Sequence, residues 1–342
     1  KDIYQGCPYE RDVIGKPEHL KNPRLSKLIE FYNTWYVANN MALIIVGDFD
    51  TESTKPMIEA TFGRLEAKEL PARPEYPEVK LTGKKHYNLG YNPMVTWIYP
   101  GVKEGDPDQD VLDFVCALLY NGQTGLLDKV NTKGDVQFAG VYSDARRNTG
   151  RIIIEAVPYY DANQQMFESD KATEAIVMRE VDKIKSGNIP DDLIANVKRM
   201  YAQGEKLTNE NSSAKMQALV ECFTYNQPID DIFTRYAKIQ ALTKDEIVRV
   251  AKKYFGADHM TISFDEDVKT MKAKTLPKPN IKPLDPVKNA KTEYAAEFQK
   301  LPKGELKQTF NDFNSVKVSS LGENVKLHYT PNTKNDIFSL TL

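Results

Sequence analysis

The sequence predicts an α+β fold, in which an antiparallel-rich sheet carries helices on one face. A strand-like run near residues 95–99 comes first, and after one helical pattern two more strand-like runs follow, near 136–143 and 151–158. Four helical patterns follow, near residues 169–186, 190–208, 212–226 and 244–255, and a strand near 259–264 closes the block. Because strands and helices are grouped in this way, we expect one sheet with a helical layer on one side.

The first 75 residues have the pattern of helix, strand, helix. A helix is expected over residues 22–36, where apolar side chains recur at i, i+3, i+4 and i+7. Residues 42–46, Ala-Leu-Ile-Ile-Val, form an apolar run typical of a strand buried on both faces. A second helix is expected over 52–62, where Pro56 fits only near the first turn. This unit cannot bury its own faces, so we expect its partner strands upstream of Lys1.

The central block, residues 80–275, contains the one complete domain that the sequence predicts. A proline-rich linker at 71–77 precedes it. Its first helix is expected between Asp106-Pro107 and Gly122, where a start signal and a stop signal flank apolar residues at helical spacing. A polar turn at 144–150 separates two of its strands.

The last part of the chain changes composition twice. Residues 276–305 are rich in Lys and Pro and predict an extended linker. Within residues 306–342, three further runs alternate like strands, at 316–319, 325–329 and 337–342. The chain starts without Met and ends inside such a run, so we expect a segment of a longer protein, with residues 306–342 opening another domain.

Composition and charge exclude several classes of function. The 46 basic and 48 acidic residues give a net charge of -2, without the basic excess of a nucleic-acid-binding protein. The three cysteines form no C-x-x-C pair, so neither a disulfide framework nor a cysteine-rich zinc site is expected. No apolar run approaches the roughly 18 residues of a membrane-spanning helix.

The histidines do not form a metal-binding motif. They are His19, His86, His259 and His328, far apart in sequence. A helical zinc site needs two histidines at i and i+4 with a glutamate between them, and Glu18-His19 resembles the end of such a motif. Position 15 is glycine, so the second ligand is missing. The other three histidines are expected at the surface or at element boundaries.

Other catalytic motifs are absent or have a simpler explanation. The sequence has no G-x-S-x-G elbow and no P-loop. Acidic residues gather at two predicted helix starts, Asp106, Asp108 and Asp110 at one and Asp191-Asp192 at the other, where they suit capping and the helix dipole. We therefore expect no catalytic, cofactor-binding or metal-binding residue in this chain.

Two stretches carry a family likeness. Residues 8–15, Pro-Tyr-Glu-Arg-Asp-Val-Ile-Gly, fit P-Y-x-x-x-x-I-G, and residues 40–48, Asn-Met-Ala-Leu-Ile-Ile-Val-Gly-Asp, fit N-M-x-L-x-x-V-G-D. With the helix between them, they resemble a block of the insulinase/pitrilysin-type zinc peptidases and the mitochondrial processing peptidases. In that family, two halves of two similar α+β domains each enclose an unfolded peptide. The resemblance implies a processing-peptidase-like sandwich domain.

The resemblance also places this chain within a longer protein. The family's first domain holds zinc through H-x-x-E-H and a later glutamate, which precede the matched block. Residues 1–75 would then end that zinc-bearing domain, 80–275 would form the second, non-catalytic domain, and 306–342 would begin a third. The resemblance implies zinc in the parent protein, a peptide or unfolded polypeptide as substrate, and contacts with other domains of the same protein.

The stretch Val130–Phe138 resembles a substrate-gripping motif of the family's fourth domain, L-R-x-K-x-G-L-x-Y. Asn131 and Phe138 stand in place of the arginine and the tyrosine. Asparagine carries no charge and phenylalanine cannot donate a hydrogen bond, so the gripping chemistry is lost. The likeness is then to a short helix that leads into a strand, as expected in a second domain. A chance match of these nine residues is the alternative.

Two functions fit the sequence equally. In the first, the parent is a zinc endopeptidase, and this segment forms chamber wall and hinge, with residues 276–305 letting the halves open. In the second, the parent is a catalytically inactive homologue that acts as partner or scaffold. The zinc ligands that distinguish the two would lie upstream. The residues carry no signal for the compartment, and a bacterial periplasm or envelope location fits such a large peptidase.

Overall fold

The structure is a computed structural model that describes residues 2–11, 13–21, 23–76, 80–88, 93–265, 277, 291–305, 310 and 313–341. The chain divides into two compact units, which are described separately. The larger consists of Lys1–Trp35, Ala42–Val46 and Glu69–Lys278. The smaller consists of Tyr36–Met41, Gly47–Lys68 and Pro279–Leu342.

The larger unit is built on a five-stranded sheet. In spatial order, its strands are β1 (Gly83–Asn88), β7 (Met260–Asp265), β2 (Met94–Pro100), β4 (Gly150–Val157) and β3 (Phe138–Ala145). Only the β1–β7 pair is parallel within this sheet, and the other three pairs are antiparallel. The expected antiparallel-rich sheet is therefore confirmed, as are the four predicted strands that became β2, β3, β4 and β7.

Strand β1 was not expected, because its sequence is polar. Gly-Lys-Lys-His-Tyr-Asn lacks the apolar run of a central strand. It lies at the edge of the sheet, where one side of the strand has no neighbour among the described residues and polar side chains are favoured. Lys85 and Tyr87 pair in register with Ile262 and Phe264 of β7.

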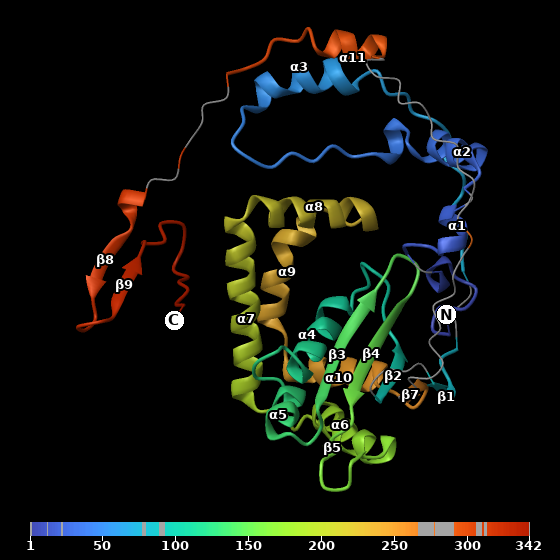
Figure 1. Ribbon diagram of the computed structural model, residues 1–342, viewed down its shortest axis with the longest axis vertical. Helices are drawn as coiled ribbons and strands as arrows, with labels where there is room; N and C mark the ends of the chain where they lie inside the picture. Colours follow the sequence, from blue (N-terminus) through green and yellow to red (C-terminus); the bar gives the residue numbers. More distant parts are fainter. Residues whose placement is uncertain are drawn as a thin grey trace. The chain divides into compact units, whose positions relative to one another are not determined.

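Helices cover one face of this sheet (Figure 1). Helices α4 (Gln109–Leu119), α5 (Leu126–Lys133) and α6 (Asp170–Lys185) contact the strands. Helices α7 (Asp191–Glu210), α9 (Asp230–Ala241) and α10 (Lys244–Tyr254) pack against α4, and α8 (Ser212–Tyr225) packs against α7. Helix α4 contacts β3 on one side and both α7 and α9 on the other. The predicted helices are confirmed, whereas α9 was missed, although Ile232, Tyr236 and Ile239 have helical spacing. A short hairpin of β5 (Tyr160–Asp161) and β6 (Met166–Phe167) precedes α6.

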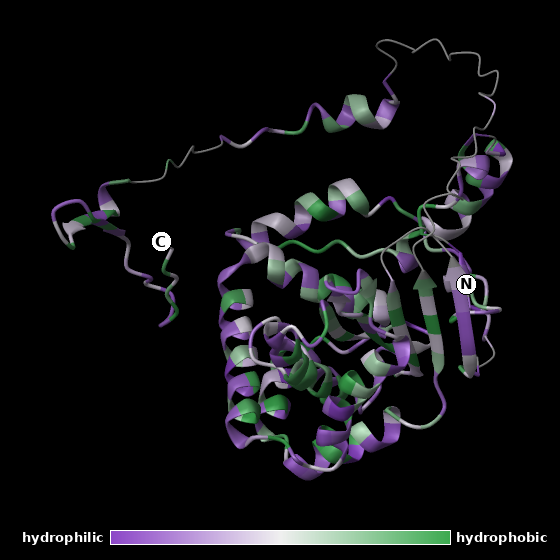
Figure 2. Ribbon diagram, turned by 60° about the horizontal axis from the view of Figure 1, so that its bottom comes forward, coloured by the Kyte–Doolittle hydropathy of each residue, from purple (hydrophilic) through white to green (hydrophobic). Residues whose placement is uncertain are grey.

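The main core lies between the sheet and the helices. Its fully buried side chains include Trp97 of β2, Phe114 of α4, and Ile152 and Ile154 of β4. Figure 2 shows hydrophobic residues concentrated on the central strands and polar residues on the outer helix surfaces. Each such side chain contributes about 1.5–3 kcal/mol on burial.

The other face of the sheet carries a smaller apolar cluster, and the N-terminal segment packs against it. The cluster consists of Leu81, Ile98, Ile153, Met260 and Ile262, with Ile3, Tyr87 and Phe264 at its margin. Arg151 of β4 donates from Nε to the Ile3 carbonyl at 2.8 Å. The buried Tyr4 donates its hydroxyl to Asp144 at the end of β3. These contacts attach the stretch that contains the 3₁₀-helix η1 (Pro8–Glu10) to the central domain.

The rest of the N-terminal stretch forms α1 (Pro17–Lys21) and α2 (Leu25–Trp35). Helix α2 confirms the helix expected over 22–36. Its apolar residues Leu25, Leu28 and Ile29 are more than half exposed, at 69%, 56% and 51%. The amphipathic pattern is therefore present, but its apolar face is not buried within the described residues.

The smaller unit contains two helices in contact and a separate hairpin. Helix α3 (Thr51–Phe62) begins at Asp50, whose carboxylate accepts from the Ser53 N–H at 2.8 Å. Tyr294 of α11 (Glu293–Phe298) donates its hydroxyl to the Thr61 carbonyl at 2.9 Å. Strands β8 (Lys317–Ser320) and β9 (Lys326–Tyr329) form the hairpin predicted near 316–329. Two 3₁₀-helices, η2 (Ala38–Asn40) and η3 (Phe313–Ser315), are the other elements in the described part of this unit.

Two expectations for the flanking segments stay predictions, and two were wrong. Residues 42–46 are extended and pair with no strand of the described structure, and their partner strands were expected upstream of Lys1, so this strand stays a prediction. The described part of 337–342 also pairs with no strand, and its assignment as the opening of a further domain stays a prediction. Most of 276–305 lies outside the described residues, but α11 shows that it is not extended throughout. Pro56 stands at the sixth position of α3, beyond the first turn.

The acidic start of α4 has a different role from the one expected for Asp108. Its carboxylate makes no capping hydrogen bond. Instead it accepts from Arg249 at 2.7 Å, Lys253 at 2.7 Å and the Tyr254 hydroxyl at 3.1 Å, all on α10. The Arg249 hydrogen bond holds the pKa of Asp108 well below its usual range, with Lys253 and Tyr254 adding to the effect. Asp108 therefore connects the start of α4 to the end of α10.

We expect Asp108→Asn to lower the free energy of unfolding by about 2–3 kcal/mol, because two cations lose their buried partner. Chemical denaturation at pH 7 measures this loss. Asp191→Asn is the control, since that side chain is 94% exposed and should change stability by less than about 0.5 kcal/mol. Because the folded pKa of Asp108 is depressed, its contribution should be present above about pH 4 and decline as pH falls further. Equal stability of the two variants at pH 7 would refute the role.

A second ionic cluster joins α4 to α9. Arg235 of α9 contacts Asp110 at 2.6 Å and Asp113 at 3.0 Å. Burial raises the pKa of Asp113 to about 6, Arg235 opposes the rise, and the nearby Asp110 adds to it. The folded state therefore binds this proton more tightly than the unfolded chain does.

We expect the stability conferred by Asp113 to be greatest below about pH 4 and to decline as pH rises through about 6. The free energy of unfolding of the wild type minus that of Asp113→Asn should therefore fall between pH 4 and pH 7, by about 1–2 kcal/mol. Urea unfolding of both proteins across this range measures the difference. A difference that grows with pH would contradict the proposed burial.

Candidate functional site

The stretch with the family's substrate-gripping pattern lies at the turn from α5 into β3, which we name the α5–β3 corner (residues 121–140). The start of α5 is held by Asp128, whose buried carboxylate accepts from the backbone N–H of Asn121 at 3.0 Å and of Gly125 at 2.8 Å. A Cβ on Gly125 would lie 2.5 Å from the Leu119 carbonyl oxygen, so only glycine fits there. The first turn of α5 is therefore tightly held against α4.

The end of α5 directs the chain into the sheet. Gly134 adopts a left-handed conformation with φ of 76°, which ends the helix. The Asp135 N–H returns to the Val130 carbonyl at 3.3 Å. Gln137 then donates its N–H to the Val157 carbonyl at 3.0 Å, and β3 begins at the next residue. The short helix leading into a strand is confirmed.

Asn131 hydrogen-bonds to the backbone of the edge strand. Its Nδ2 donates to the Ala139 carbonyl at 2.9 Å, and its Oδ1 accepts from the Ala139 N–H at 2.7 Å. The side-chain amide thus provides the donor and the acceptor that a neighbouring strand would provide. Because both of its polar atoms are occupied, Asn131 fixes α5 to β3 and does not reach toward a ligand.

Phe138 also has a packing role. Its ring lies 5.8 Å from the Tyr120 ring in an edge-to-face arrangement, and 37% of its surface is exposed. A Cβ on Gly140 would lie 2.8 Å from the Phe138 Cζ, so this ring covers the glycine two residues along the strand. Both positions that differ from the gripping motif therefore support the corner.

The sheet face opposite the main core, which we name the second sheet face, has an exposed part beside this corner. Tyr142 of β3 is 48% exposed and shares a hydrogen bond with the half-buried Glu155 of β4. Burial raises the pKa of Glu155, while Tyr142 acts in the opposite direction. Neither residue belongs to a recognised motif, but each alternates with core residues along its strand, which places it on the other face of the sheet.

The four histidines occupy separate places. His19 is exposed on α1, which begins at Pro17, so position 15 lies outside that helix. His86 on β1 hydrogen-bonds to Ser263 at 2.9 Å, and His259 lies before β7 with its ring 4.8 Å from that of Tyr99. His328 is exposed on β9. No three His, Cys, Asp or Glu residues of the described chain lie together as metal ligands.

The three cysteines and the helices add two further facts. Cys7, Cys116 and Cys222 are buried free thiols, the last two within α4 and α8. None of the helices in the described ranges combines the length and the hydropathy needed to cross a bilayer.

Comparison with known proteins identifies related chains. Residues 24–201 match the family model described as the peptidase M16 inactive domain. The zinc protease PqqE of Helicobacter pylori is 22% identical over 269 residues, which cover 75% of this chain and 58% of that protein. The chain therefore spans little more than half the length of this curated relative.

Solved structures share the fold. The crystal structure of a peptidase M16 inactive domain from Pseudomonas fluorescens has a TM-score of 0.65 at 19% identity, covering 78% of this chain and 63% of that one. The first half of the periplasmic protease PqqL from Escherichia coli has a TM-score of 0.59 at 16% identity, covering 75% and 58%. These similarities confirm the α+β peptidase-like fold.

We expect Asn131→Ala to lower the free energy of unfolding by about 1–3 kcal/mol, because both backbone groups of Ala139 lose their partner. Thermal and urea unfolding measure the loss. Gln137→Ala is the matched control, since this neighbouring side chain is exposed and should change stability by less than about 0.5 kcal/mol. Asn131→Arg, which introduces the arginine of the gripping motif, should be as unstable as Asn131→Ala. Full stability of the arginine variant would contradict the role of the amide.

Proposed function

Because this chain belongs to the peptidase M16 family, we propose that it is the non-catalytic central part of a zinc-dependent endopeptidase. The observation that carries the proposal is that Asn131 and Phe138 contact other residues of their own domain. Both residues are committed to the corner, so this domain provides structure where the gripping motif would provide substrate contacts. The chemistry of bond cleavage then belongs to another part of the whole protein.

The proposed division of the chain follows the family arrangement. Residues 1–75 would complete the zinc-bearing domain, 80–275 would form the second domain, 276–305 the hinge segment, and 306–342 the start of a third domain. The exposed apolar residues of α2 support this division, since such a face is typical of a surface that other protein covers. We place the zinc ligands upstream of this chain, because in the family they precede the block that residues 8–48 resemble.

In this proposal, the second sheet face forms part of the chamber wall. Tyr142 and Glu155 offer a hydroxyl and a carboxyl on an exposed part of the sheet, next to the aromatic ring of Phe138. Such groups can hydrogen-bond to peptide amides and pack against side chains without taking part in cleavage. The substrate class would be unfolded polypeptides. The Escherichia coli relative is described as periplasmic, so we also propose a bacterial periplasmic location.

The experiment that tests the proposal is to sequence the coding DNA upstream of Lys1 and to express the resulting longer protein. We expect H-x-x-E-H and a later glutamate within about 200 residues, one to two domain lengths. The longer protein should bind zinc and cleave an unfolded peptide, and a chelator should abolish cleavage. This chain alone, as the control, should do neither.

Two outcomes would change the assignment. If an upstream domain of this type is present but its ligands are replaced, the parent is a silent homologue that acts as partner or scaffold. If the chain alone cleaves peptide in a metal-dependent manner, the assignment of cleavage to another part of the protein is wrong.

A further inference from the structure

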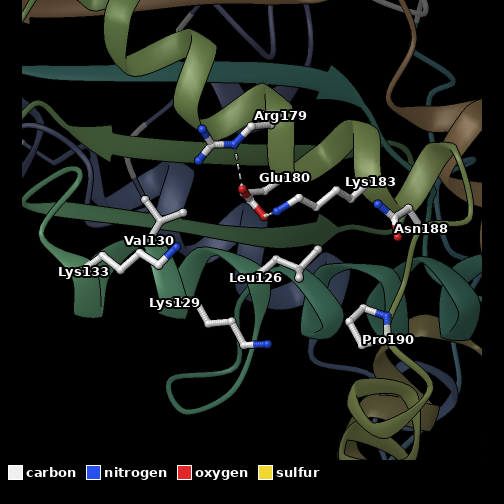
Figure 3. A pocket seen from close by; sticks show the side chains of 9 residues that line it. All are labelled: Leu126, Lys129, Val130, Lys133, Arg179, Glu180, Lys183, Asn188 and Pro190. Atoms are coloured by element: carbon white, nitrogen blue, oxygen red, sulfur yellow. Dashed lines mark hydrogen bonds and ion pairs between the residues drawn. The ribbon is translucent and has the colours of Figure 1, made fainter.

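A pocket between α5 and α6 lies apart from the sheet face described above. It has a volume of about 280 Å³. Its lining residues are Leu126, Lys129, Val130 and Lys133 of α5, Arg179, Glu180 and Lys183 of α6, and Asn188 and Pro190 of the following loop. Figure 3 shows the α5 lysines on one side of this space and the charged residues of α6 on the other.

Positive charge dominates the lining of the pocket. Lys129, Lys133, Arg179 and Lys183 contribute four positive charges, and Glu180 contributes one negative charge, which leaves a net charge of +3. Lys129 and Lys133 stand at i and i+4 on one face of α5, and neither forms an ion pair within the described residues. Like charges in one hollow repel each other, and an anion would relieve this repulsion.

Glu180 holds the α6 cations in place. Its side chain is only 4% exposed, and its two carboxylate oxygens contact Arg179 Nε at 3.1 Å and Lys183 Nζ at 2.5 Å. A buried carboxylate needs such partners, so both cations are held beside the pocket. With both oxygens of Glu180 occupied, Lys129 and Lys133 have no carboxylate left to neutralise them among the lining residues.

The shape and chemistry of the pocket indicate a class of ligand. Arginine and lysine side chains suit the oxygens of phosphate, a group that carries more than one negative charge at neutral pH. Leu126, Val130 and Pro190 add an apolar wall, which a free anion would not contact favourably. Known ligand pockets start at about 300 Å³, so this one has room for a small molecule only.

We propose that the α5–α6 pocket binds a small phosphate monoester, with the phosphate held by Lys129, Lys133 and Arg179 and the organic part against the apolar wall. This proposal does not depend on the proposed peptidase role. It assigns a ligand to the helical layer of the domain, on the opposite side of α5 from the Asn131 tether to β3.

The test is calorimetric titration of the whole chain with glycerol 3-phosphate, inorganic phosphate and glycerol at low ionic strength. We expect saturable binding of glycerol 3-phosphate, weaker binding of inorganic phosphate, and none of glycerol. Replacing two of the phosphate's charged partners in Lys129→Gln/Lys133→Gln should weaken binding at least roughly tenfold. Lys171→Gln is the matched control, because Lys171 is an exposed lysine of α6 outside the pocket lining, and this variant should bind as the wild type does.

Circular dichroism of each variant separates loss of binding from loss of folding, and the exposed lysines are expected to tolerate glutamine in a helix. The proposal is overturned if glycerol 3-phosphate shows no saturable binding, or if the folded double variant binds it as the wild type does. Equal loss in Lys171→Gln would show general charge attraction instead of a site. Equal affinity for inorganic phosphate would refute the role of the apolar wall.

Discussion

The structure depends on the apolar contact between one face of the five-stranded sheet and the helices that cover it. Trp97, Ile152 and Ile154 point from the strands into this layer, and Phe114 enters it from α4. Because side chains alternate along a strand, burying this set directs its neighbours to the opposite face. The position of Tyr142 and Glu155 beside the α5–β3 corner follows from that alternation. The exposed sheet face is thus a consequence of the core.

Hydrogen bonds and ion pairs at the ends of elements then decide how the helices are placed. Asn131 connects α5 to β3, and Asp108 connects the start of α4 to the end of α10. The sequence pattern around each of these residues suggests another role. The motif match suggests substrate contact at position 131, and the helix start suggests capping by Asp108. In each case one buried group needs a partner, the backbone of Ala139 in the first and the Asp108 carboxylate in the second, so pairing that group takes precedence.

The carboxylates of the helical layer differ in their partners and in their burial. Asp108 has three donors from α10, which favour its charged form. Asp113 is partly buried beside Asp110 with one arginine between them, and burial favours its neutral form. Glu180 is more deeply buried than either and holds two cations at the rim of a pocket. Comparable acidic residues therefore contribute to stability, to pH dependence and to the charge of a candidate site, according to their partners.

Much of the fold was predictable from local sequence patterns. Periodicity and stop signals identified the central strands, most of the helices and the α+β class, because these features depend on residues near in sequence. The two motif stretches at residues 8–15 and 40–48 were enough to indicate the peptidase family, which the match over residues 24–201 then showed. The altered residues at 131 and 138 also predicted that the gripping chemistry would be lost.

Only the tertiary structure decided what these residues do instead. The amide of Asn131 meets Ala139 eight residues later, and Asp108 meets α10 more than 140 residues later, contacts that no local pattern encodes. The polar strand β1 could be recognised only by its pairing with β7, which is distant in sequence. The apolar run at 42–46 has strand character but no partner among the described residues, so its strand stays a prediction. Sequence by itself determined the propensity of each segment, whereas the choice of partner depended on which distant groups the fold brought together.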